Sequence, residues 1–184
     1  ALPPGKYASV EQRSAFLHSV IEGIDTIPGV EGAAMSSGLP FGAGLSSRSP
    51  MRPLEASSLP VGESMTANWR IVTPDYFRVM KIPVLAGRAL TDQDIRGETI
   101  PGMVTQLTAR RLWGSSDPLG HTFQMSSGLK FRIVGVAGDI RDSDLRQEPF
   151  PGLYFPASAV LRPLMDIAVR AKGDPLVLVP AVRE

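Results

Sequence analysis

The chain has 184 residues, of which 43% are hydrophobic and 20% charged, a composition typical of a folded globular domain and not of a disordered segment. The formal net charge is +1, which excludes a strong field for holding nucleic acid or an anionic membrane surface. The sequence contains no cysteine, and this excludes thiol catalysis, zinc–thiolate sites, iron–sulfur clusters and disulfides. No stretch reaches the about 20 apolar residues that a transmembrane helix needs.

The first part of the chain predicts one long helix followed by strands. Apolar residues recur at three- and four-residue steps from Ser9 to Ile27, which is the pattern of an amphipathic helix. Residues 30–36 predict a strand, and the stretch 38–62 predicts a flexible loop with a short strand near 49–54. In 64–72 apolar and polar residues alternate, so this segment predicts a strand with one apolar face.

A short helix is expected next, because Thr73-Pro74 is a typical helix start in which threonine caps the helix and proline opens it. We expect this helix to end at Met80 and to pack Tyr76 and Phe77, together with Trp69, into a common core.

The second half predicts mostly strands with short connections. Expected strands lie at 83–87, 101–105, 121–125, 129–139, 153–155 and 165–171, and expected helices lie at 106–113 and from Asp174-Pro175 onward. Segments 121–125 and 129–139 form a hairpin, and Gly135 and Gly138 mark bulges or close backbone approach. The order of elements predicts an α+β fold with mixed or antiparallel sheets.

Candidate catalytic residues are few. Ser14, His18 and Glu22 lie four residues apart on the first helix and imitate a catalytic triad. We interpret them as a solvated polar face opposite the apolar stripe, because a triad needs a buried orienting acid and an oxyanion hole. His121 stands at a strand start, where we expect a surface or capping role. The serine-nucleophile pattern G-x-S-x-G is absent.

Candidate metal ligands are carboxylates. The aspartates that could offer oxygens to calcium are Asp92, Asp94, Asp139, Asp142 and Asp144. Arg141 and Arg146 interleave with the second group, which favours a solvated and self-neutralised turn, and the first group lacks a twelve-residue calcium loop ending in glutamate.

Nucleotide and nucleic-acid sites have little support. The glycine-rich stretches 38–44 and 135–138 carry neither a G-K-[ST] ending nor the G-x-G-x-x-G spacing. Two cationic side chains, Arg110 and Arg111, stand near one aromatic ring, Trp113. On a near-neutral domain these are too few charges and rings to bind a nucleic-acid strand.

A family resemblance comes from short segments shared in the same order. They are Ile27–Glu31, Ser37–Pro40, Val72–Phe77, Ile82-Pro83, Gly87-Arg88, Asp117–Gly120, Ile133–Arg141, Leu153–Pro156, Val169-Arg170 and Gly173–Pro175. In this order the chain resembles the MacB-like periplasmic core domain of bacterial ABC-transporter permeases, in the ADOP-type (acidobacterial duplicated orphan permease) variant. Similar proteins place Asn-Glu before the following helix where this chain has Thr105-Gln106, which puts that strand-to-helix boundary in question.

The resemblance implies a two-lobed α+β fold. The whole chain 1–184 would then be a single extracytoplasmic domain, a fragment of a larger permease with both ends as cut points. Its inserted lobe would span about 88–160, and its first lobe would comprise 1–87 plus 161–184. It also implies a place in the cell membrane on the periplasmic side, between the first two transmembrane helices.

The implied function is non-catalytic coupling of transmembrane helix motion to substrate export or partner docking. Partners would be the transmembrane helices of the same permease, a separate cytoplasmic ATPase subunit or domain, and a second copy of the domain or a periplasmic protein. The resemblance implies no catalytic, cofactor-binding or metal-binding residue. Two alternatives stay open: a secreted hydrolase using Ser14, His18, Glu22 or His121, and a free-standing module for a peptide or cell-wall ligand.

Overall fold

The structure, a computed structural model, describes residues 10–42, 47–95, 97–142, 144–160 and 164–183. The helices are α1 (Val10–Asp25), α2 (Tyr76–Met80), α3 (Gln106–Trp113), the 3-10 helix η1 (Pro175–Leu178) and α4 (Val179–Arg183). The strands are β1 (Val30–Ser36), β2 (Ser47–Pro53), β3 (Met65–Val72), β4 (Val84–Gly87), β5 (Ile100–Thr105), β6 (Thr122–Met125), β7 (Lys130–Ala137), β8 (Gly152–Pro156) and β9 (Asp166–Ala171). The prediction of an α+β fold with a mixed sheet is confirmed.

Six strands close into a barrel. They follow the order β2-β6-β7-β5-β8-β3, and β3 pairs back with β2. The β5–β7 and β3–β8 pairs are parallel, while the other barrel pairs are antiparallel. The antiparallel β6–β7 pair is the predicted hairpin. Because this part of the sheet closes on itself, each barrel strand is paired on both sides.

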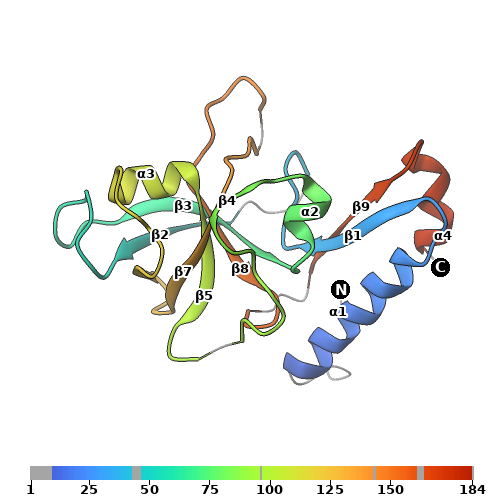
Figure 1. Ribbon diagram of the computed structural model, residues 1–184, viewed down its shortest axis with the longest axis horizontal. Coiled ribbons are helices and arrows are strands. Elements are labelled where there is room, and N and C mark those ends of the chain that lie inside the picture. The colour runs from blue at the N-terminus through green and yellow to red at the C-terminus, as the bar shows by residue number, and fades with distance from the viewer. Residues whose placement is uncertain (1–9, 43–46, 96, 143, 161–163, 184) are drawn as a thin grey trace.

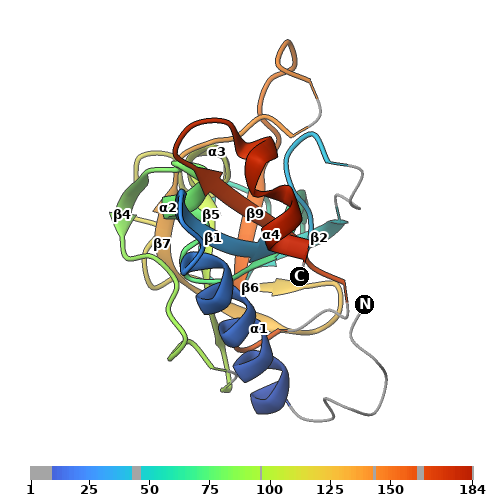
Figure 2. The same ribbon diagram turned by 90° about the vertical axis from the view of Figure 1, so that its right-hand side faces the viewer.

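The barrel continues on one side into a two-stranded extension. Strand β1 joins β3 through the pair Ser36 and Val72, and β9 runs antiparallel to β1. Helix α1 packs on β1, while α2 packs on both β1 and β9. Figure 1 shows α1, β1, β9 and α4 gathered beside the barrel, and the connection between β7 and β8 projecting away from it. In the turned view of Figure 2, α1 descends across the face of β1.

Aromatic rings fill the barrel. Phe131 stacks on Phe155 with ring centroids 3.9 Å apart, and Phe123 stacks on Phe131 at 5.4 Å. All three are buried. They belong to the larger hydrophobic cluster, which also takes Leu17 and Ile21 from α1. The barrel interior and the helix on the extension therefore share one continuous core.

A second buried cluster lies where α2 meets the sheet. Tyr76, Phe77 and Tyr154 contact one another with centroids 5.0 to 6.0 Å apart. Burial raises the pKa of both tyrosines above the ordinary value, so they act as neutral core rings. The prediction that Trp69 shares this core is wrong. Trp69 packs on the larger cluster instead, because it lies on the same face of β3 as Ala67 and Ile71, whereas Val72 on the opposite face joins the cluster of Tyr76 and Phe77.

The expected cap of the short helix is also wrong. Helix α2 begins at Tyr76, and Asp75 precedes it without a side-chain cap bond. The Thr73 hydroxyl instead accepts a hydrogen bond from the Met35 N–H at 2.9 Å. A buried strand-end N–H close by offers this hydroxyl a tertiary partner, which sequence pattern does not reveal. By contrast, Thr105 caps α3 by accepting from the Thr108 N–H, so the helix begins where 106–113 was predicted.

Gly135 in β7 and Gly138 directly after it stand at positions of close approach, as predicted. A Cβ on Gly135 would collide with the Arg88 carbonyl oxygen, and one on Gly138 would lie 2.9 Å from Pro83 Cγ. The segment 83–88 can therefore lie directly against β7. The division into lobes 88–160 and 1–87 plus 161–184 stays a prediction.

Candidate functional site

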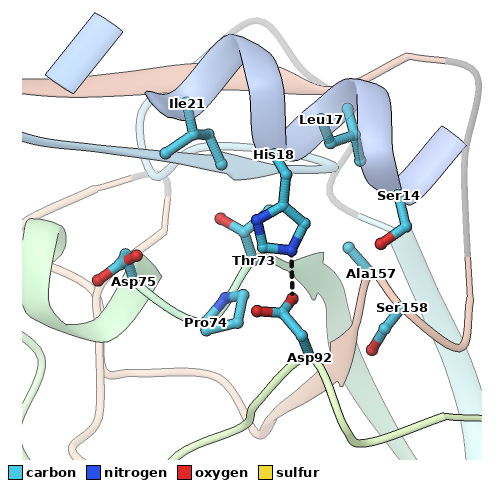
Figure 3. A pocket seen from close by; sticks show the side chains of 10 residues that line it. All are labelled: Ser14, Leu17, His18, Ile21, Thr73, Pro74, Asp75, Asp92, Ala157 and Ser158. Carbon is cyan, nitrogen blue, oxygen red and sulfur yellow. Dashed lines mark ion pairs between the residues drawn. The ribbon is translucent and has the colours of Figure 1, made fainter. Parts of the chain in front are cut away.

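The candidate site is a small cleft between α1 and three loops. Its volume is about 40 Å³, enough for a few water molecules, since a cavity needs about 10–15 Å³ to hold one. The lining residues are Ser14, Leu17, His18, Ile21, Thr73, Pro74, Asp75, Asp92, Ala157 and Ser158. Figure 3 shows α1 forming one wall, with the segments after β3 and β8 and the β4–β5 connection opposite.

A histidine–aspartate pair crosses this cleft. His18 Nε2 lies 2.9 Å from Asp92 Oδ1, and the two side chains are 45% and 49% exposed. The predicted polar face is about half exposed at His18, but Ser14 and His18 also line a cleft, which the sequence analysis did not predict. That face looks toward loops contributed by distant parts of the chain, and helical periodicity describes only the helix itself.

The cleft does not assemble the triad that Ser14, His18 and Glu22 imitate in the sequence. Glu22 is exposed and does not line the cleft, so the acid beside His18 is Asp92. A half-exposed ion pair lacks the desolvation that gives a catalytic dyad its strength. The pair links α1 to the β4–β5 connection and is suited to holding two elements together.

His121 lies elsewhere. Its ring stacks on Trp113 with centroids 5.1 Å apart, and its Nδ1 is 3.9 Å from Glu55 Oε2. Trp113 is itself buried, so it cannot serve as an exposed stacking platform for a base. His121 therefore covers a core tryptophan.

The aspartates after β7 separate from one another. Asp142 Oδ1 lies 2.5 Å from Arg70 Nη2, and its Oδ2 accepts from Asn68 Nδ2 at 2.5 Å. Asp139 accepts from the Leu107 N–H, and Asp144 accepts from the Arg146 N–H. The interpretation of a self-neutralised solvated turn is thus wrong for Asp142, because its cation comes from β3 and the pair is almost buried.

The pair of Asp142 and Arg70 fastens two loops to the barrel. Arg70 Nε also donates to the Gly38 carbonyl at 2.9 Å, and the Phe41 N–H donates to the Asp142 carbonyl at 2.7 Å. The connections after β1 and after β7 are therefore held through one buried charge pair. Sequence reasoning missed this pair because an arginine inside an alternating strand resembles an ordinary outward-facing residue.

Asp94 also has a specific cation. Arg88 Nη1 and Nη2 donate to its two carboxylate oxygens at 2.8 and 2.7 Å, and the Thr91 N–H donates at 2.8 Å. Burial alone would raise the pKa of Asp94, but the hydrogen bonds from Arg88 and Thr91 outweigh it and hold the pKa below its ordinary value of 3.8.

Acid is expected to remove the stabilisation that Asp94 provides. A carboxylate whose pKa is lowered by folding stabilises the folded state above its unfolded pKa and loses that effect as pH falls through the folded pKa. The free energy of unfolding should differ most between the unmodified chain and Asp94→Asn above about pH 4, and the difference should shrink below it. Urea unfolding from pH 7 to 3 measures this, with Asp174→Asn as an exposed control. A difference that stays constant or grows toward acid would contradict the assignment.

Within the residues that the structure describes, no group of three or more histidine, aspartate or glutamate residues could hold a metal ion. Among the same residues, no helix has the length and apolar character to cross a bilayer.

The closed barrel and its helix-covered extension define a mixed α+β domain. The chain belongs to the MacB-like periplasmic core domain family, whose model matches residues 7–181. No curated protein matches it.

Solved structures share the fold. The periplasmic region of MacB from Actinobacillus actinomycetemcomitans is 19% identical, with a TM-score of 0.63 over 90% of this chain and 70% of that one. The extracellular domain of the noncanonic ABC-type transporter YknZ from Gram-positive bacteria is 18% identical, with a TM-score of 0.58 over 91% and 78%.

Proposed function

We propose that this chain is a non-catalytic domain of an ABC-transporter permease that lies outside the cytoplasmic membrane and couples transmembrane helix motion to export or partner docking. The observation that carries the proposal is the family match over residues 7–181. ATP hydrolysis would then take place in a separate cytoplasmic subunit or domain.

The arrangement of α1 supports a mechanical role. Leu17, Ile21 and Ile24 are buried in the larger cluster, which continues into the barrel. His18 adds a polar link to Asp92 on the far side of the cleft. Because packed interiors are dense and transmit strain, a displacement of α1 reaches the barrel as a whole.

The proposal includes the partners of the domain. The transmembrane helices of the same permease would be its neighbours in the chain. The domain would lie between the first and the second of these helices. A second copy or a periplasmic protein would contact the barrel side. The division into a first lobe and an inserted lobe at 88–160 belongs to this proposal.

Substitution of the polar residues in the cleft tests the absence of catalysis. A half-exposed pair is worth under about 1 kcal/mol, so His18→Ala with Asp92→Asn in the parent permease should leave ATP hydrolysis and transport within about twofold. The purified permease with its ATPase provides the measurement, and Ser19→Ala on the exposed part of α1 is the control. If the 184-residue chain turned over ester, peptide or glycoside substrates and these substitutions abolished it, the hydrolase alternative would replace the proposal.

A further inference from the structure

A second hollow, apolar in character, opens in the barrel wall. It has a volume of about 110 Å³ and is lined by Ser49, Trp69, Met125, Ser127, Leu129, Phe131, Phe155 and Val160. These residues come from β2, β3, β6, β7 and β8, together with the β6–β7 turn and the segment after β8. The hollow is therefore built by convergence of strands and does not depend on one loop.

The walls are aromatic and uncharged. Phe131 and Phe155 form a stacked pair with centroids 3.9 Å apart, and Trp69 tilts against Phe155 at 6.2 Å. Met125 adds a thioether, which makes favourable contacts with aromatic rings. Among the described lining residues, only Ser49 and Ser127 are polar.

Small residues create the space. Ser49 lies on β2 opposite Ala67, and its hydroxyl is 2.7 Å from the Ser126 hydroxyl, so the hydroxyl already has a polar neighbour. On β5, Gly102 lies beside Phe155, since a Cβ there would be 3.4 Å from Phe155 Cδ1. The stacked rings of Phe131 and Phe155 can therefore lie deep in the barrel. The residue of β2 that lines the hollow beside them is the small Ser49, which leaves space next to the rings.

We infer that this hollow binds an uncharged aromatic group about the size of a single substituted ring. An apolar cavity of roughly 150 Å³ is known to take benzene, and a slightly smaller, open hollow accommodates a ring that projects partly outward. Aromatic walls favour an aromatic guest through edge-to-face and offset contacts. A charged guest is disfavoured because none of the lining residues that the structure describes carries a charge. Barrel mouths are common places for such sites.

This inference stands apart from the proposed function, because it concerns one hollow and requires no movement. If the domain also acts in a permease, the aromatic part of a small molecule would be the ligand. An apolar side chain of a partner protein is the competing occupant. Saturable binding of a free aromatic molecule to the chain would favour the small-molecule ligand instead.

Titration of toluene into the full 184-residue chain tests the site. Met125 and Trp69 line the hollow, whereas Met80 and Trp113 lie elsewhere, so ¹³C-methyl methionine and ¹⁵N-indole signals supply probes and internal controls. We expect saturable shifts at Met125 and Trp69, with Met80 and Trp113 unchanged. Cyclohexane should bind more weakly, and benzoate should not bind.

Filling the hollow supplies the matched variants. Ser49→Phe places a ring inside it and should weaken toluene binding at least about tenfold, a change of about 1.4 kcal/mol. Thr66→Phe adds the same ring at an exposed position of β3 and should leave binding unchanged. Dispersed spectra of both variants establish that they fold.

Three outcomes would overturn the inference. They are an absence of saturable shifts in the unmodified chain, toluene binding that survives Ser49→Phe in a folded variant, and cyclohexane or benzoate binding as tightly as toluene.

Discussion

Replacing Asp142 by alanine should cost the domain about 3–5 kcal/mol, the usual cost of leaving a buried charge without its partner. Arg70 is only 6% exposed, and Asp142 is its carboxylate partner at 2.5 Å. The substitution also removes the acceptor of Asn68 Nδ2. Because most domains are stable by only about 5–15 kcal/mol, urea unfolding should show a large loss of unfolding free energy.

Two further variants separate the charge pair from the loop. Asp144→Ala removes an aspartate whose recorded bond is to the Arg146 N–H of its own turn, and it should cost less than about 1 kcal/mol. Arg70→Met combined with Asp142→Leu removes both charges and should be less destabilised than Asp142→Ala alone. Equal effects of Asp142→Ala and Asp144→Ala would show that the buried pair does not fasten the loops.

Phe155→Ala should be similarly severe, at about 3–5 kcal/mol, because a buried phenylalanine leaves a cavity that its neighbours fill only partly. Phe155 is 2% exposed and stacks on Phe131. Its strand, β8, is paired with β3 on one side and β5 on the other in the closed sheet, so the surrounding backbone has little freedom to collapse. Thermal unfolding and urea unfolding measure the loss.

Phe150→Ala is the matched control for this ring deletion. Phe150 is half-buried, and the Arg48 guanidinium lies 4.5 Å above its ring. Such an exposed cation–π contact contributes about 0.5–1 kcal/mol, so the control should lose far less stability. A Phe155→Ala variant as stable as the control would mean that the aromatic stack is not the centre of the core.

Local patterns predicted the elements well, and contacts between distant segments explain what they missed. The alternation in 64–72 corresponds to β3 at Met65–Val72. Successive side chains of a strand point to opposite faces, so the strand's own residues show which face is apolar. Closure of the barrel by β2 and β3 was not predictable, since alternation does not say which strands pair. The same limit placed Trp69 in the wrong cluster.

At the candidate site, too, the contacts that sequence reasoning missed join residues that lie far apart in the chain. His18 was visible as a histidine on a helix, but its partner Asp92 lies 74 positions later in the chain and was considered only as a calcium ligand. Asp142 was likewise assigned to neighbouring arginines, although Arg70 is its partner. Ordered short segments across nearly the whole chain indicated the family, which the match over 7–181 confirms.

The coupling role is tested most directly by distances in the parent permease. The 184 residues contain no cysteine, so Ser19→Cys on the exposed part of α1 accepts a single nitroxide label per domain. Electron–electron dipolar spectroscopy then compares nucleotide-free permease with ATP-bound permease blocked in hydrolysis. The proposal predicts that the distance between the labels of two copies shifts when ATP binds. Superimposable distance distributions, in a preparation that hydrolyses ATP when unblocked, would contradict it.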